Sequence, residues 1–333
     1  MNKKYTRTLG RSGIEVSALG MGCWAIGGPW TLDGKSAGWS VVDQAESERA
    51  LNTAIDMGIT FFDTAATYGA GFSERLVGKV LKGRRDQFII ATKFGYEIRE
   101  AKREVVHYDA EETKSDVASR LKIDVEDSLA RLNTDYIDVY LIHVWGLEID
   151  KALAAREVLE ELVKEGKIRT YGWSTDRTDA IAAFSTKPAC SVVEQQLSVL
   201  DGNMELLALC ENQNLTSINR GPLGMGLLTG KFVPESTFAS DDVRHVADWH
   251  PGFKDGKPTQ DWLNKLSSIQ DVLCSEGRTL AQGALAWIWA RSTNTVPIPG
   301  FKTVAQVKEN ANAMQFGPLT VEQMTEIRQI LGR

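Results

Sequence analysis

The feature that most constrains the fold is a repeated pattern in which an apolar, β-prone run stops at a titratable side chain. Three successive runs of this kind end at Asp63, Lys93 and His143. Stretches with apolar residues at helical spacing separate them, as in residues 46–57 before the first run. Strands that alternate with helices form parallel sheets, and the carboxyl ends of parallel strands lie at one edge. The pattern therefore predicts a sheet edge at which ionisable groups meet.

The rest of the chain continues this alternation of strands and helices. Eight strands alternating with helices favour a closed (β/α)8 TIM barrel of the α/β class over an open doubly wound sheet. No GxGxxG motif opens a helix after the first strand, which argues against a Rossmann-type fold. We also expect an N-terminal β-hairpin below the barrel and long loops at the carboxyl end of the strands. The expected strands are residues 18–24, 59–62, 88–92, 136–142, 170–175, 191–195, 215–220 and 295–300, and the long loops are residues 25–43, 95–115 and 233–258.

Length and composition limit the kinds of partner. The 333 residues fit a single barrel domain over residues 1–333, because barrels of this size are commonly one domain. The net charge of −6 argues against nucleic acid and anionic membranes as partners. No apolar stretch approaches membrane-spanning length, and the four cysteines and four histidines show no metal-ligand spacing. We therefore expect a soluble cytoplasmic protein without a metal, and nothing in the sequence points to a particular oligomeric state.

The end of the second strand places an acid and a phenol five positions apart. A carboxylate such as Asp63 is costly to bury without a cation, and Lys93 at the end of the next strand can provide one. At roughly 4 Å, an ammonium would stabilise the Tyr68 phenolate by about 4 kcal/mol, or about three pKa units before desolvation reduces the effect. This predicts a phenol able to donate and accept a proton. For any one of these residues, the alternative is a structural hydrogen bond at a strand end.

Three motifs together resemble the aldo-keto reductase family, in particular its bacterial members. They are Asp63-Thr64-Ala65-x-x-Tyr68-Gly69-x-Gly71-x-Ser73-Glu74, then Thr92-Lys93, then Leu141-Ile142-His143. The resemblance extends from about Arg7 to the last helix. It implies an NADPH-dependent carbonyl reductase on a (β/α)8 barrel, with Asp63, Tyr68, Lys93 and His143 as its catalytic tetrad. Many relatives have a proline and an acid after the histidine, whereas this chain has Val144-Trp145-Gly146.

The resemblance also assigns contacts to the nicotinamide carboxamide. Relatives use a serine, an amide residue and a glutamine, and the matching positions here hold Ser174, Thr175 and Glu194, with Gln195 as the alternative if the register is shifted by one. Arg220 stands where relatives commonly stack an aromatic ring under the nicotinamide. Because Glu194 and Arg220 end neighbouring strands, we expect them to form an ion pair beneath the ring.

Two further stretches resemble the segments that bind the phosphates. Residues 221–231 resemble the pyrophosphate loop, and residues 300–310 resemble the adenosine end, where Lys302 would read the 2′-phosphate. Gln306 replaces an arginine common in relatives, so NADH is the alternative cofactor. Besides the carboxamide and ring contacts, the resemblance assigns cofactor binding to Gly22, Cys23, Trp24, Gly221, Leu223, Gly224, Gly230, Lys231, Gly300, Lys302, Thr303, Gln306, Glu309 and Asn310.

Four tryptophans in the predicted loops suggest a flat aromatic substrate pocket. Trp24, Trp30, Trp39 and Trp145 would suit a sugar or a ring ketone among small carbonyl or alcohol substrates, although each is equally compatible with a role in fixing its loop. Two other functions fit a barrel with a lysine at a strand end. One is a Schiff-base aldolase that uses Lys93, and the other is a non-enzymatic regulatory barrel that binds a nicotinamide cofactor.

Overall fold

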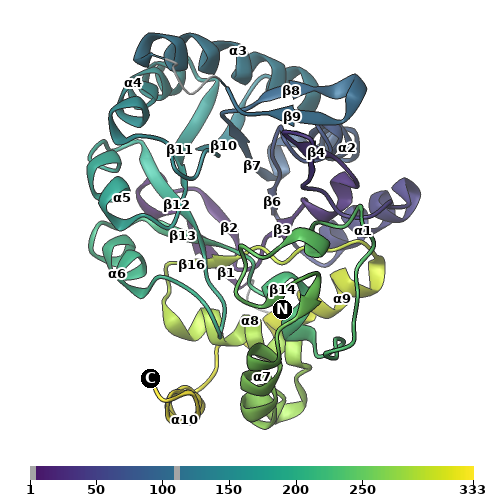
Figure 1. The fold of residues 1–333 in the computed structure, drawn as a ribbon. Coiled ribbons are helices and arrows are strands. Elements are labelled where there is room, and N and C mark those ends of the chain that lie inside the picture. Colours follow the sequence, from purple (N-terminus) through teal and green to yellow (C-terminus); the bar gives the residue numbers. More distant parts are fainter. Residues whose placement is uncertain (1–4, 109–112) are drawn as a thin grey trace.

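The computed structural model describes residues 5–108 and 113–333, within which eight parallel strands form a barrel surrounded by helices (Figure 1). The strands pair in chain order, and the first meets the last: Gly22 N–H donates to Pro299 O at 3.1 Å. A Cβ on Gly22 would lie 2.7 Å from Ile298 O, so this seam requires a glycine. The predicted (β/α)8 fold is confirmed. The barrel strands are β3 (Met21–Gly22), β6 (Phe61–Asp63), β7 (Ile89–Phe94), β10 (Ile137–Ile142), β11 (Ile168–Ser174), β12 (Cys190–Gln196), β13 (Thr216–Arg220) and β16 (Thr295–Pro297).

The helices form the outer layer, and several begin at side chains that cap their first turn. Before the eighth helix, Thr279 and Gln282 satisfy each other's backbone N–H groups. Residues 281–289 of that helix are all buried, as their apolar sequence predicts. The helices are α1 (Gln44–Asp56), α2 (Phe72–Leu81), α3 (Lys114–Leu132), α4 (Ile149–Lys164), α5 (Thr178–Phe184), α6 (Met204–Asn212), α7 (Gln260–Leu273), α8 (Leu280–Arg291), α9 (Val304–Asn312) and α10 (Val321–Leu331).

The interior of the barrel is apolar at one end and charged at the other. The predicted N-terminal hairpin, β1 (Thr6–Thr8) with β2 (Glu15–Ser17), lies below the strands, and its apolar side chains join those inside the barrel. Because side chains alternate along a strand, the next inward positions beyond this apolar layer form a polar layer at the carboxyl end. The apolar layer is Leu9, Ile14, Val16, Phe61, Ala91, Val139, Leu141, Val192, Ile218, Val296 and Ile298. The polar residues at these next inward positions are Asp63, Lys93, His143, Glu194 and Arg220, and the stagger between strands places them at different heights.

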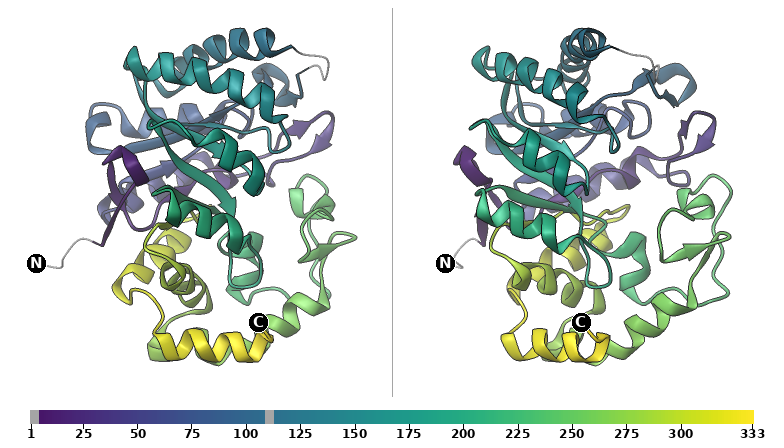
Figure 2. Two further views of the ribbon diagram at one scale, coloured as in Figure 1. Left: turned by 90° about the vertical axis from the view of Figure 1, so that its left-hand side faces the viewer. Right: turned by 60° about the vertical axis from the view of Figure 1, so that its left-hand side comes forward.

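The long loops contain regular structure that we did not expect from the sequence. Short strands β4 (Thr31–Leu32), β5 (Lys35–Ser36), β8 (Glu97–Arg99) and β9 (Glu104–Val106) form a four-stranded sheet, here called the mouth sheet. These strands are only two or three residues long, so they carry no clear alternation of polar and apolar residues. The third loop contains the small hairpin β14 (Phe253–Lys254) and β15 (Lys257–Pro258). Figure 2 shows the N-terminal hairpin and these loops at opposite ends of the barrel.

No helix within residues 5–108 and 113–333 is long and apolar enough to cross a membrane. In the same ranges, no three His, Cys, Asp or Glu side chains gather in a group that would hold a metal ion.

Candidate active site

Lys93 is the centre of a buried charged cluster at the carboxyl end of the barrel. Its Nζ, on β7, lies 2.7 and 2.8 Å from the two carboxylate oxygens of Asp63 on β6. Nζ is also 3.0 Å from Thr64 O, 3.2 Å from the Tyr68 hydroxyl and 3.2 Å from Glu194 Oε2. Lys93 is 0% exposed and Asp63 is 1% exposed. The cation that burial of Asp63 requires is therefore Lys93. We call Asp63, Tyr68, Lys93 and Glu194 the Lys93 cluster.

A close approach of two turns fixes the backbone at Tyr68. A Cβ on Gly27 would lie 2.9 Å from both Gly69 N and the carbonyl carbon of Tyr68, so no larger residue fits at position 27. Gly69 itself has a φ of 65°, in the left-handed region that favours glycine. The glycine in the motif after Tyr68 thus has a structural cause: it lets the β6–α2 turn pack against the turn that follows β3.

The ionisation of Tyr68 differs from the sequence expectation. Burial raises the pKa of the phenol; Lys93 lowers it, but Asp63 and Glu194 raise it again. The predicted net lowering of the Tyr68 pKa is therefore wrong, because burial outweighs the effect of the lysine and the two carboxylates add to it. Although burial alone would lower the pKa of Lys93, Asp63 and Glu194 raise it, so the ammonium stays charged. At neutral pH the pair is a protonated phenol beside a cation.

His143 follows β10 and faces the same space. Its Nδ1 lies 3.3 Å from Thr67 Oγ1, and its ring meets the rings of Tyr68 and Tyr96 edge to face at 5.8 and 5.7 Å. Burial and the neighbouring Lys93 hold the pKa of His143 well below its usual value. A neutral imidazole has one N–H donor and one acceptor nitrogen, so His143 can donate a hydrogen bond to a substrate oxygen.

The predicted ion pair between Glu194 and Arg220 is wrong. Glu194 Oε1 accepts a hydrogen bond from Ser174 Oγ at 3.1 Å, while Oε2 faces Lys93. Arg220 instead pairs with Asp176. The cause is the strand register: Arg220 lies two residues beyond the β13 partner of Glu194, so the two side chains occupy different levels of the barrel.

The predicted carboxamide contacts are likewise engaged with other groups. The hydroxyl of Thr175 donates to Trp145 O at 3.0 Å. Gln195 is directed away from the barrel interior, and its Nε2 donates to Ser217 Oγ at 2.7 Å. Both oxygens of Glu194 are already engaged within the barrel. Gln195 Oε1 has no hydrogen-bond partner, but its strand position directs it away from the barrel interior.

Gln196 is a candidate that the sequence analysis missed. It shares the inward face of β12 with Glu194, one level nearer the mouth. Its Oε1 accepts from Arg220 Nη1 at 3.4 Å, while its Nε2 is buried without a hydrogen-bond partner. A Cβ on Gly221 would lie 2.7 Å from this Nε2, so the loop after β13 leaves room for the amide only because it has a glycine there. Strand alternation from Glu194 was the signal that would have identified it.

Three cations lie near Asp242 at the rim of the barrel, with Asp241 and Glu309 also close to the lysines. Arg244 Nε and Nη2 lie 2.8 and 2.7 Å from the oxygens of Asp242. The guanidinium of Arg244 lies 4.7 Å from the centre of the Trp39 ring, and Lys302 Nζ lies 5.5 Å from it. Burial lowers the pKa of Lys302 and of Lys231. Sequence reasoning missed Arg244 because only the folded third loop brings it beside Lys302.

The start of α9 is capped by the protein itself. Thr303 Oγ1 accepts from Gln306 N–H at 3.3 Å, and Gln306 Oε1 accepts from Lys302 N–H at 2.7 Å. The carboxylate of Glu46 on α1 accepts from Val304 N–H at 2.9 Å, which lowers the pKa of Glu46. The resemblance also implies that backbone N–H groups at this helix start receive the 2′-phosphate, but a carboxylate already occupies one of them.

The other predicted cofactor residues lie at the mouth, with two exceptions. Gly22 belongs to the seam between β3 and β16, as described above. Cys23 is fully buried; burial and Asp63 raise the pKa of its thiol, which lies 3.6 Å from Met21 O. The remaining positions are on the segments that follow β13 and β16: Gly221, Leu223, Gly224, Gly230, Gly300, Glu309 and Asn310.

Of the four tryptophans, three are at least partly exposed and one is buried. Trp24 stacks on Tyr68 with ring centres 6.2 Å apart and meets Trp39 edge to face at 5.4 Å. Trp145 is 54% exposed near the end of β10. Trp30, by contrast, is 8% exposed and packs in the apolar cluster beneath the mouth sheet. Trp30 therefore holds its loop in place, which was the alternative to a pocket role.

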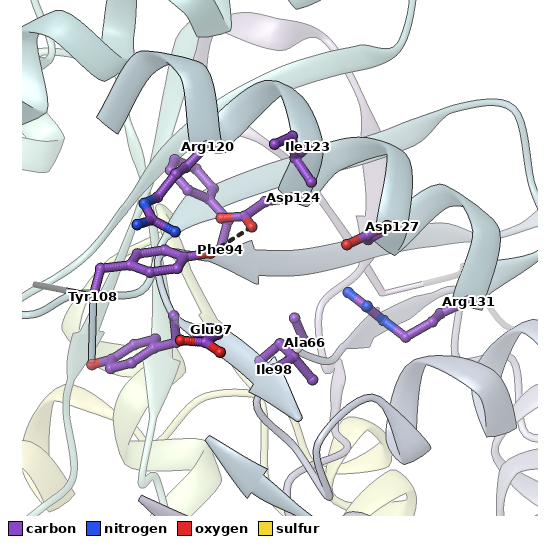
Figure 3. A pocket seen from close by; sticks show the side chains of 11 residues that line it. Ala66, Phe94, Glu97, Ile98, Tyr108, Arg120, Ile123, Asp124, Asp127 and Arg131 are labelled. Atoms are coloured by element: carbon purple, nitrogen blue, oxygen red, sulfur yellow. Dashed lines mark hydrogen bonds between the residues drawn. The ribbon is translucent and has the colours of Figure 1, made fainter. Parts of the chain in front are cut away.

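A cavity of about 200 Å³ lies beside the site, between α3 and strands β7 and β8 (Figure 3). Tyr108 donates its hydroxyl to Asp124 Oδ1 at 2.7 Å across this cavity. Asp124 Oδ2 is buried without a hydrogen-bond partner, and burial raises the pKa of Asp124 to about 7. Tyr96 lines the cavity and also contacts His143, so its ring separates the two spaces.

Comparison with known proteins agrees with the fold and the motifs. The family model described as Aldo/keto reductase family matches residues 18–332. The aldo-keto reductase YhdN of Bacillus subtilis (strain 168) is 32% identical over 340 residues, which cover 98% of this chain and 93% of the relative.

Solved structures are similar over the whole chain as well. A glycerol dehydrogenase from Gluconobacter oxydans superposes with a TM-score of 0.82 at 26% identity, covering 100% of this chain and 96% of that one. An aldo/keto reductase from Klebsiella pneumoniae, in complex with NADP and acetate, gives a TM-score of 0.70 at 25% identity, covering 98% and 95%. This chain therefore belongs to the aldo-keto reductase family.

Proposed function

We propose that this protein is an NADPH-dependent carbonyl reductase, acting reversibly on a small aldehyde or ketone, with Tyr68 as its general acid. The observation that carries the proposal is the placing of Tyr68: its hydroxyl lies 3.2 Å from a charged lysine and its ring meets that of His143. A phenol next to a fixed cation can give up a proton and hold the resulting charge.

In this mechanism the protein supplies a proton and orients the carbonyl. The cofactor, when bound, supplies the hydride. His143 donates a hydrogen bond to the carbonyl oxygen and fixes its direction. As the oxygen gains negative charge, Tyr68 donates its proton to it, and the Lys93 ammonium stabilises the phenolate that remains. Asp63 holds Lys93 in position through two hydrogen bonds. In the reverse direction the phenolate accepts the proton of the alcohol.

The mouth of the barrel contains groups that fit a dinucleotide. The buried Nε2 of Gln196 has no partner and suits the oxygen of a carboxamide, in place of the contacts first assigned to Thr175 and Glu194. The planar guanidinium of Arg220 suits stacking under a ring. At the rim, Lys231 and Lys302 suit phosphates. The NADP complex of the Klebsiella pneumoniae relative supports the same choice of cofactor.

The substrate would enter past Trp24, Trp39 and Trp145, which suits a compact or ring-shaped carbonyl compound. A Schiff-base aldolase is disfavoured, because such a lysine must lose its proton to act as a nucleophile, and the pKa of Lys93 is raised. We place the enzyme in the cytoplasm, where the four free cysteines would remain reduced.

The test is a panel of aldehydes, ketones and sugars, with oxidation of NADPH followed by its absorbance. We expect turnover with at least one carbonyl class and direct binding of NADPH by fluorescence. Binding of NADPH without turnover on the whole panel, in either direction, would instead support a regulatory barrel. Trapping of a substrate on Lys93 by borohydride would support an aldolase.

A further inference from the structure

The Lys93 cluster contains two buried carboxylates and one ammonium. Glu194 is 1% exposed, and its Oε2 has no hydrogen-bond donor other than the nearby Lys93 ammonium, 3.2 Å away. Five oxygens lie within 3.2 Å of Lys93 Nζ, which has three protons to share. Glu194 and the Tyr68 hydroxyl therefore compete for the same cation.

The other groups around the cluster do not balance this charge. His143 is neutral, and the Cys23 thiol and the Tyr96 phenol keep their protons because burial raises the pKa of both. Arg220 is paired with a carboxylate of its own. The titratable and charged groups that face the cluster are Cys23 after β3, Asp63 on β6, Tyr68 after β6, Tyr96 after β7, His143 after β10, Glu194 on β12, and Arg220 on β13 with its partner Asp176 after β11.

We propose that Glu194 is a positioning residue that acts through Lys93: as a second carboxylate on that ammonium, it holds Tyr68 in the protonated form and so favours carbonyl reduction over alcohol oxidation. Reduction consumes the proton of the phenol, whereas oxidation requires the phenolate as base. The inference rests on the proposed function only for this last consequence. The electrostatic coupling itself is a property of the protein without cofactor or substrate.

The size of the effect follows from the distances. The Glu194 oxygen and the Tyr68 oxygen contact the same nitrogen, so they lie within about 6 Å of each other. Burial and the nearby Glu194 raise the pKa of the Asp63 carboxyl well above its usual value, and Lys93 acts against them. Removing one charge at that distance should lower the pKa of Tyr68 by about one to two units at an effective dielectric near 20.

The experiment is an ultraviolet titration of tyrosinate in the protein free of cofactor. The contribution of Tyr68 is isolated by subtracting the same titration of Tyr68→Phe, in the parent and in Glu194→Gln. The change Glu194→Gln keeps the size and the Ser174 contact while removing the charge, and Glu194→Ala is the second variant in case the amide distorts the packing. Glu160→Gln is the matched control: Glu160 accepts a hydrogen bond from Tyr171 at 2.6 Å on the outer layer, far from Lys93.

We expect the Tyr68 step to move to lower pH in both Glu194 variants and to stay in place in Glu160→Gln. The acid limb of the pH profile for alcohol oxidation should move with it. An unmoved Tyr68 step in Glu194→Gln and Glu194→Ala, or an equal movement in Glu160→Gln, would overturn the inference. If the step moves but no carbonyl or alcohol is turned over, the proposed function fails while the coupling stands. If turnover is normal but the step does not move, the inference alone fails.

Discussion

Each end of the barrel buries a group of charged side chains. The two groups have opposite proportions of cations and carboxylates. Near the amino end of β10, Asp138 is 0% exposed and pairs with two cations, Arg85 at 2.6 Å and Arg169 at 2.7 Å. Asp138 Oδ2 also accepts from Ile90 N–H at 3.0 Å, so both of its oxygens are satisfied. At the carboxyl end, one cation, Lys93, faces two carboxylates and a phenol.

The difference distinguishes a structural ion pair from a reactive one. The guanidinium of Arg169 reaches solvent, with 45% of its side chain exposed, so the excess positive charge at the amino end is hydrated. The Lys93 cluster is buried throughout, and burial together with Glu194 raises the pKa of Asp63 well above its usual value. A buried imbalance of charge shifts proton affinities, and such shifts gather at sites where protons are transferred.

Removing the Tyr68 hydroxyl from the Lys93 cluster should abolish most activity. We expect Tyr68→Phe to lower kcat for carbonyl reduction by roughly 10²–10⁴-fold, because the proton donor acts in the transition state. The dissociation constant of NADPH should change little. Tyr136→Phe is the control at the other end, where the Tyr136 ring lies 4.1 Å from the Arg85 guanidinium, and it should keep near-normal turnover. A loss smaller than about tenfold in Tyr68→Phe would show that another group is the acid.

Breaking the ion pairs of Asp138 at the amino end of the barrel should reduce stability and leave catalysis intact. Asp138→Ala leaves the guanidinium of Arg85 partly buried without its acid, and we expect a loss of about 3–5 kcal/mol in the free energy of unfolding. Arg169→Gln should cost much less, because Arg85 remains to pair with Asp138. Urea denaturation measures both, and the turnover of the folded fraction should equal that of the parent. A stability loss in Asp138→Ala no larger than that of Arg169→Gln would contradict this account.

The sequence predicted well which residues end the strands. It did not predict the stagger between neighbouring strands. Asp63, Lys93 and His143 could be placed together because each ends its own strand, and the ends of parallel strands share an edge. The pairing of Glu194 with Lys93 depends on the stagger between strands, which no single strand encodes. The mouth sheet was missed for a related reason: it joins β4 and β9, which are distant in the chain and too short to show a pattern. The direction of the Tyr68 pKa shift was mispredicted because burial outweighs Lys93, and the depth of burial is a property of the folded barrel.

The cations at the rim should select the cofactor. Lys231, Arg244 and Lys302 lie near Asp242, with Asp241 near Lys302 and Glu309 near Lys231, and a 2′-phosphate would add charge-assisted contacts to these cations. We expect Lys302→Met to raise KM for NADPH roughly 10-fold or more, with little change for NADH, in line with the strength of a charged hydrogen bond. Glu46→Gln should have the opposite sign, since it removes a carboxylate from the start of α9. Equal changes for NADPH and NADH would show that neither residue reads the phosphate.

The smallest effect concerns the partly buried carboxyl of Asp124. Its Oδ2 has no hydrogen-bond partner, whereas both oxygens of Asp138 have one. The folded Asp124 pKa of about 7 lies above the value near 3.9 of an unfolded aspartate, so the folded state favours the protonated form. The stability that this proton provides is complete below about pH 4 and is lost progressively as the pH rises to about 7. Asp124→Asn, which stays neutral and can still accept from Tyr108, should therefore match the parent in Tm at pH 4.5 and exceed it at pH 8. The gain at pH 8 should be on the order of 1 kcal/mol or more. A Tm difference independent of pH would show that the carboxyl is already hydrated or paired in the folded protein.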